Sequence, residues 1–161
     1  QKACALAERI LRPRLQRRAD IVISSAGGVP WDRTLFDVCA CGMMATTACK
    51  DHGILVLVAE CGDGLGRFAS LKPGPRESKG PATIGRKAFT LEKFVDYSLQ
   101  RLCTDHRVYL VSTLPEHQVS TLGILPARSV GTAYQRAIRH AGKDATVALM
   151  SHGCLTAPII G

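Results

Sequence analysis

The chain has 161 residues, of which 46% are hydrophobic, and a net charge of +8. This length is typical of one domain with a hydrophobic core. No segment reaches the roughly 18 consecutive apolar residues that span a bilayer, and no apolar export signal stands at the start, so we expect a cytoplasmic protein without a membrane partner. Aromatic residues make up only 5% of the chain, and no RNP-like or helix-turn-helix pattern accompanies the basic residues, which argues against nucleic-acid binding.

The seven cysteines form an odd set without a regular framework, which favours reduced thiols in a cytosol over a secreted disulfide scaffold. The cluster Cys39-Ala40-Cys41 with Cys49 lacks the spacing of a structural zinc site. We therefore expect this chain to bind no metal by itself. Because the chain begins with Gln1 and not Met, and residues 2–18 already form a helical pattern, we also expect it to be a piece of a longer protein.

The first predicted element is a cationic amphipathic helix over residues 2–18. Its apolar residues recur at helical spacing and are Leu6, Ile10, Leu11 and Leu15. We expect this helix to dock on the sheet, and a strand at about 20–25 to follow it. Asp32 is predicted to cap the next helix, which runs to about Asp51 and is ended by His52-Gly53.

The second predicted strand, 54–59, is an unbroken apolar run, which is typical of a strand covered on both faces of a parallel sheet. A short helix at 64–71 and a loop at 72–81 are expected next, because glycine, proline and basic residues dominate there. The later elements are a helix at 91–103, a strand at 107–112, a short helix near Pro115, a helix at 130–141 between Ser129 and Gly142, and a strand at 146–150. This alternation predicts a single α/β domain over 1–161, with a small, Rossmann-like parallel sheet and helices on both faces.

Each predicted strand ends in polar or flexible residues, which therefore converge on the carboxyl edge of the sheet, where open α/β sheets bind ligands. Gly27-Gly28 could present backbone N–H groups to a carboxylate or phosphate, or form only a tight turn. Asp63 is expected to order its loop by hydrogen bonding, and Glu60 to titrate only if it is buried. His152, the one histidine at a predicted strand end, is expected to be structural.

The run Gly62-Asp63-Gly64-Leu65-Gly66 suggests a dinucleotide site, but its G-x-G-x-G spacing departs from the G-x-G-x-x-G fingerprint. It also follows the second strand of the pattern, and no suitable acidic residue ends a strand about twenty residues later. A P-loop, a nucleophile elbow and a Ser-His-Asp order are missing from the sequence as well. A nucleotide-binding enzyme therefore stays a third alternative, to be tested by nucleotide affinity.

Three segments resemble, in the same order, the C-terminal half of the nickel-dependent lactate racemase family: GGVPWDRTLFD (27–37), ECGDGLG (60–66) and HGCLTAPII (152–160). The resemblance implies hydride transfer between a 2-hydroxy acid and a nickel pincer nucleotide, the cofactor of that family. It also implies that the lysine and histidines that hold the cofactor belong to an N-terminal domain of the same protein, outside this chain. This chain alone is then expected to be inactive and to hold no catalytic residue.

The resemblance further implies that this half closes over the cofactor cleft and supplies side chains near the substrate. The matching cleft positions are Gly27, Gly28, Asp32, Arg33, Phe36, Asp37, Asp63, Gly64 and Gly66. Where the family commonly has Tyr-Gln followed by Lys, this chain has Phe36-Asp37 and then Ala40-Cys41. Asp37 would repel a substrate carboxylate unless it pairs with Arg33, so we expect a racemase or epimerase of a 2-hydroxy acid other than lactate.

The rival hypothesis is a non-catalytic α/β binding module. Basic residues concentrate in residues 1–18 and 67–93, and they would attract a small anion or an acidic partner. Ordinary solvated surface explains the same pattern.

Overall fold

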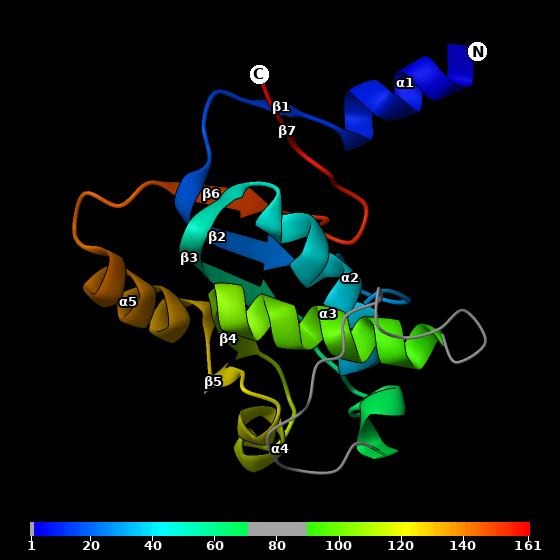
Figure 1. Ribbon diagram of the computed structural model, residues 1–161, viewed down its shortest axis with the longest axis vertical. Coiled ribbons are helices and arrows are strands. Elements are labelled where there is room, and N and C mark those ends of the chain that lie inside the picture. Colours follow the sequence, from blue (N-terminus) through cyan, green and yellow to red (C-terminus); the bar gives the residue numbers. More distant parts are fainter. Residues whose placement is uncertain (1, 71–89) are drawn as a thin grey trace.

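The structure is a computed structural model that describes residues 2–70 and 90–161 (Figure 1). Its elements in chain order are α1 (Lys2–Leu11), β1 (Arg14–Leu15), β2 (Ala19–Ser25), α2 (Leu35–Thr46), β3 (Cys49–Val58), the 3-10 helix η1 (Gly66–Ser70), α3 (Leu91–Asp105), β4 (Arg107–Val111), α4 (Glu116–Thr121), β5 (Leu125–Ala127), α5 (Val130–Ala141), β6 (Val147–Met150) and β7 (Ile159–Ile160). The short helix expected at 64–71 is η1, and the loop expected at 72–81 lies outside the described residues.

The centre of the molecule is a five-stranded sheet in the order β5-β4-β3-β2-β6, and every neighbouring pair in it is parallel. In register, Ile23 of β2 lies between Val56 of β3 and Leu149 of β6. The chain steps outward from β2 to β5 and then returns to the other side of β2 as β6. The carboxyl ends of β2 and β6 therefore meet where the strand order reverses, the point at which such sheets open a crevice.

Helices cover both faces of this sheet, as the sequence predicted. Successive residues of β3 point to opposite faces: Ile54 and Val56 pack in one buried cluster with α5, and Leu55 and Leu57 pack in the other with α2 and α3. Figure 1 shows α3 lying across the sheet on the side of α2. The predicted α/β fold is thus confirmed. Within residues 2–70 and 90–161, no helix has the length and apolarity to cross a membrane.

The boundaries of α2 differ from the prediction at both ends. Thr34, and not Asp32, caps the helix: its side chain accepts a hydrogen bond from the backbone of Asp37, and the Asp37 carboxylate accepts one from the backbone N–H of Thr34. This reciprocal pair is a capping box. The helix ends at Thr46, and 49–53, expected to close it, are the first residues of β3. The exposed polar side chains of residues 50–52 hid that start of the strand.

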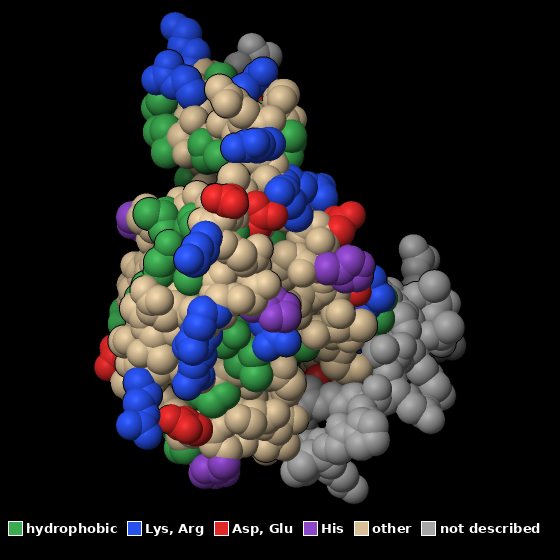
Figure 2. Space-filling model, turned by 90° about the vertical axis from the view of Figure 1, so that its left-hand side faces the viewer, with side chains coloured by type: hydrophobic (Ala, Val, Ile, Leu, Met, Phe, Trp, Pro, Cys, Tyr) green, Lys and Arg blue, Asp and Glu red, His purple; other side chains and the backbone are tan. Residues whose placement is uncertain are grey.

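The prediction for the N-terminal helix is wrong in length and in position. α1 ends at Leu11, shortly before Pro13, whose missing N–H and fixed φ do not suit a helix interior. No residue of α1 is buried, and Leu6 and Ile10 are 50% and 63% exposed. α1 projects from the body of the molecule and does not dock on the sheet (Figures 1 and 2). The chain returns to the body through β1, which pairs in parallel with β7.

Candidate functional site

Four strand ends are joined by backbone hydrogen bonds at the carboxyl edge of the sheet. Ala26 N–H, directly after β2, donates to Val58 of β3 at 3.0 Å, and Ala59 N–H donates to Val111 of β4 at 3.0 Å. On the other side, Gly153 N–H, after β6, donates to Ser25 of β2 at 2.7 Å. The segments that follow β2, β3, β4 and β6 therefore start side by side, as the topology predicted.

The loop after β3 runs beside the loop after β2 and is hydrogen-bonded to it. Cys61 N–H donates to Asp32 O at 2.8 Å, and Asp63 N–H donates to Arg33 O at 2.9 Å. Leu35 N–H, at the start of α2, donates back to Gly64 O at 3.1 Å. These bonds bring together two of the three segments on which the family resemblance rests, 27–37 and 60–66.

Arg33 and Asp63 fasten the two loops together through their side chains. The Asp63 carboxylate accepts from Arg33 Nε at 2.7 Å and lies 2.6 Å from Arg33 Nη2. Asp63 therefore orders its loop, as expected. Asp37 does not pair with Arg33, the partner considered for it above: its carboxylate accepts instead from the Thr34 hydroxyl at 2.6 Å.

An aromatic and cationic cluster lies beside this ion pair. The rings of Phe36 and Phe68 meet edge to face, with centroids 5.3 Å apart, and the Arg67 guanidinium lies 5.6 Å from the centroid of the Phe36 ring. Arg67 also pairs with Glu92 at the start of α3. Sequence reasoning named Phe36 but missed Arg67 and Phe68, whose signal was their place directly after the GDGLG run.

The glycines of both loops have backbone conformations that other residues rarely adopt. Gly27 and Gly28 have φ values of 99° and 84°, and Gly64 and Gly66 have 85° and 60°. A side chain on Gly27 would lie 3.3 Å from the His152 ring, so the segment after β6 closes on the first loop. The structure thus brings the third resembling segment, 152–160, to the same edge.

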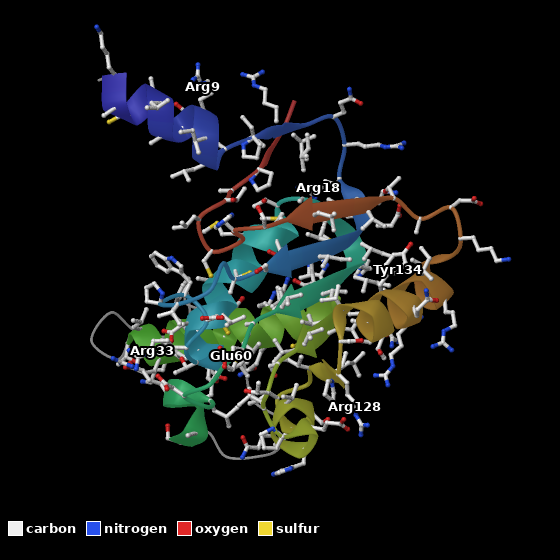
Figure 3. The ribbon with its side chains drawn as sticks, turned by 180° about the vertical axis from the view of Figure 1, so that it is seen from behind. Arg9, Arg18, Arg33, Glu60, Arg128 and Tyr134 are labelled. Carbon is white, nitrogen blue, oxygen red and sulfur yellow. The ribbon has the colours of Figure 1, made fainter. Side chains whose placement is uncertain are left out.

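Asp32 is the buried acid of the site. It is 8% exposed, its Oδ2 accepts from Glu60 N–H at 3.4 Å, and its Oδ1 has no hydrogen-bond partner within the described residues. Glu60 itself is exposed and lies at the same end of the sheet as Arg33 (Figure 3). Nearby, burial raises the pKa of Cys61 to about 12, so this thiol stays protonated and is a poor nucleophile.

The positions that depart from the family pattern lie on two sides of α2. Asp37 is exposed and Ala40 half-buried, whereas Cys41 is fully buried against the sheet. Of the departing positions, Phe36, Asp37 and Ala40 can therefore meet a ligand, whereas Cys41 cannot.

The residues present do not fit nickel as a metal held by this part of the chain. Within 2–70 and 90–161, no three His, Cys, Asp or Glu side chains are grouped so that they could hold a metal ion. What the edge offers is an ordered polar surface: two positive-φ glycines after β2, a cross-loop ion pair and an arginine stacked on a ring. Such a surface can close over a ligand held by another part of a protein.

The sequence of this chain is similar to known proteins. A family model described as the lactate racemase C-terminal domain matches residues 15–156. A lactate racemase from Thermoanaerobacterium thermosaccharolyticum is 28% identical over 143 residues, which cover 84% of this chain and 33% of that protein. The chain therefore spans about one third of the length of this curated relative.

A solved structure shows the same fold. The lactate racemase apoprotein from Thermoanaerobacterium thermosaccharolyticum superposes with a TM-score of 0.86 at 24% sequence identity, over 99% of this chain and 39% of that one. At this identity the likeness concerns the arrangement of the backbone.

Proposed function

This chain belongs to the lactate racemase C-terminal domain family, and from that premise we propose that it is the C-terminal, cleft-closing part of a longer 2-hydroxyacid racemase or epimerase. The observation that carries the proposal is the joining of the two resembling loops by three backbone hydrogen bonds and the Arg33–Asp63 ion pair. The loops form one surface at the carboxyl edge, where a parallel sheet binds its ligands.

The chemistry proper belongs to the rest of that longer protein. The resemblance implies a nickel pincer nucleotide as the cofactor, which would supply hydride transfer when bound to that other part of the protein. The residues described here do not form a metal-binding group, so we assign them to closing the cleft, excluding water and orienting the acid. The N-terminal domain of the same protein is then the partner that holds the cofactor.

The side chains of α2 favour an acid other than lactate. Asp37 replaces an amide with a carboxylate, and although its charge is engaged by the capping box, it remains exposed. Ala40 supplies no cation at the position of the family's lysine. Among the described residues, this edge carries Arg33 and Arg67, and both are paired with carboxylates. A substrate with a larger apolar group, packed on the Phe36 ring, suits this surface better.

The test of the site is a pair of matched aspartate variants in the full-length enzyme, produced together with the cofactor-synthesis enzymes. Asp63→Asn removes the charge that holds Arg33 across the loops, and we expect racemisation to fall at least about tenfold, the effect of losing about 1.4 kcal/mol. Asp51→Asn is the control, because Asp51 also pairs with an arginine, Arg18, but lies before the buried part of β3. Equal activity in both variants, with circular dichroism unchanged, would remove the site assignment.

A second candidate, the anion-binding module, is favoured by one other observation. Arg107, Arg128 and Arg136 line a groove of about 520 Å³ beside β5 and α5, far from Arg33 (Figure 3). Glu116 pairs with Arg128 and Arg136 donates to Pro126 O, so two of these charges already have partners. Calorimetric titration with an acidic peptide tests this candidate. Binding that becomes weaker in Arg107→Gln would support the module, and the absence of binding would exclude it.

A further inference from the structure

Two cysteines of the protein lie against each other where α2 meets the segment after β6. Cys41 is fully buried, with its Sγ 3.2 Å from the Ser24 hydroxyl. Cys154 is half-buried, packs against the buried cluster that contains Cys41, and its Sγ lies 3.9 Å from Trp31 O. The sulfurs come from residues more than one hundred positions apart, so the fold itself creates the pair.

Gly153 is the reason the two segments approach so closely. Its backbone N–H donates to Ser25 O at 2.7 Å, and a Cβ at this position would lie 2.6 Å from Cys41 Sγ and closer still to the Ser24 hydroxyl. Glycine at this position therefore lets Cys154 lie beside Cys41, whereas a residue with a side chain would push the segment after β6 away from α2.

The surroundings also make Cys41 unlike the other buried thiols. Burial alone raises the pKa of a thiol, as it does at Cys39 and Cys49. At Cys41 the hydrogen bonds from Cys154 and Ser24 outweigh burial, and the pKa is lowered. The contact with Cys41 and burial raise the pKa of Cys154, so the two thiols titrate as a pair: once one proton is lost, the proton that remains is shared between them, and the singly deprotonated pair is the nucleophile.

We propose that Cys41 and Cys154 are a redox-active pair that closes to a disulfide when the protein meets a hydroperoxide. The half-exposed Cys154 sulfur, as thiolate, attacks the peroxide oxygen; the O–O bond breaks, and with one proton the products are a sulfenic acid and water or an alcohol. Cys41 sulfur then attacks Cys154 sulfur, the S–O bond breaks, and hydroxide leaves as water with the thiol proton of Cys41. Two thiols are oxidised and one peroxide is reduced.

The bond would join the segment after β6 to α2 directly beneath the first loop of the candidate site. A Cβ at Gly27 would lie 3.3 Å from the ring of His152, the residue before Gly153, and Cys154 Sγ lies 3.9 Å from Trp31 O. An S–S bond of about 2.05 Å is shorter than any hydrogen-bonded contact of two thiols, so closing it draws this segment inward. The inference stands on this geometry and does not depend on the proposed racemase activity.

The test is peptide mapping of the intact protein after treatment with hydrogen peroxide and blocking of free thiols. Trypsin cuts after Arg33, Lys50 and Lys143, so the expected product joins peptide 34–50 to the peptide that begins at Asp144. That second peptide carries Cys154, whereas 34–50 carries Cys39 and Cys49 besides Cys41. The link should therefore vanish in Cys41→Ser and in Cys154→Ser, survive in Cys39→Ser and in Cys4→Ser, and be released by dithiothreitol.

Two results would overturn the proposal. One is oxidation of Cys154 to sulfinic acid, or its complete alkylation, with no linked peptide. The other is a link that persists in Cys41→Ser, which would assign it to Cys39 or Cys49. Because Cys41 is buried and its variant can lose the fold, Cys154→Ser at the half-buried position provides the second variant, and thermal unfolding of both shows whether the folded protein was tested.

Discussion

At the scale of single residues, the loops of the candidate site depend on how closely Gly66 approaches Thr34. A Cβ at Gly66 would lie 2.6 Å from Thr34 Oγ1, whereas a Cβ at Gly64 meets nothing within 4 Å. Both glycines have positive φ, so alanine at either costs about 1–2 kcal/mol of backbone strain. Only at Gly66 is the capping box of α2 also disturbed.

The two alanine variants therefore form a matched pair. We expect Gly66→Ala to lower the free energy of unfolding by about 1–2 kcal/mol more than Gly64→Ala, because a lost helix cap costs about 1 kcal/mol and the crowding adds to it. Urea unfolding at neutral pH measures the difference. Equal unfolding free energies would show that Thr34 is free to move aside.

The glycines of the candidate site could be predicted from the sequence, but the partners of its charged side chains could not. Gly27, Gly28, Gly64 and Gly66 stand out as turn formers at strand ends, and they hold positive φ. The pairing of Arg33 with Asp63 joins residues 30 positions apart, and no local pattern reports such a contact. Thr34 was overlooked as the cap although Asp37 stands three residues later, which is the spacing of a capping box.

At the scale of elements, Asp20 joins the starts of three neighbouring strands. Its carboxylate accepts from Lys50 of β3 at 2.7 Å, and from the Thr146 hydroxyl and backbone N–H before β6 at 2.7 and 2.9 Å. These bonds hold the pKa of Asp20, led by the contribution of Lys50, well below its usual range. A carboxyl whose pKa is lower in the folded chain stabilises the fold above its unfolded pKa of about 3.9, and loses this contribution as pH falls toward the folded value.

Asp20→Asn tests this junction. Because the side chain is 30% exposed, we expect a loss of only about 1 kcal/mol in the free energy of unfolding at neutral pH. The difference from the unchanged protein should shrink as pH is lowered from about 5 to about 2. Asp51→Asn, at an ion pair whose acid is 89% exposed, should change stability by less than about 0.5 kcal/mol at every pH. A pH-independent difference for Asp20→Asn would contradict the junction.

Elements with a continuous apolar pattern were predictable, and those built by tertiary contacts were not. The buried part of β3, together with α3 and α5, follows its hydrophobic pattern closely. β5 has three residues, including Pro126, and β1 and β7 have two each, so these strands exist only through their partners. α1 has the amphipathic pattern of a docked helix, yet no described part of the chain covers it.

At the scale of the whole molecule, this chain spans about one third of the length of the curated relative that it matches. The α/β architecture was predictable because strand and helix patterns alternate. The activity was not, because no group of metal-binding side chains lies within the described residues and the motif resemblance alone suggested the cofactor.

The measurement that tests the central claim most directly is made on the full-length protein produced with the cofactor-synthesis enzymes. Nickel content is determined per chain, and a panel of 2-hydroxy acids that includes lactate is followed by chiral chromatography. We expect about one nickel per chain and racemisation or epimerisation of at least one acid that is bulkier than lactate. A protein without nickel that leaves every acid unchanged would contradict the account and favour the binding module.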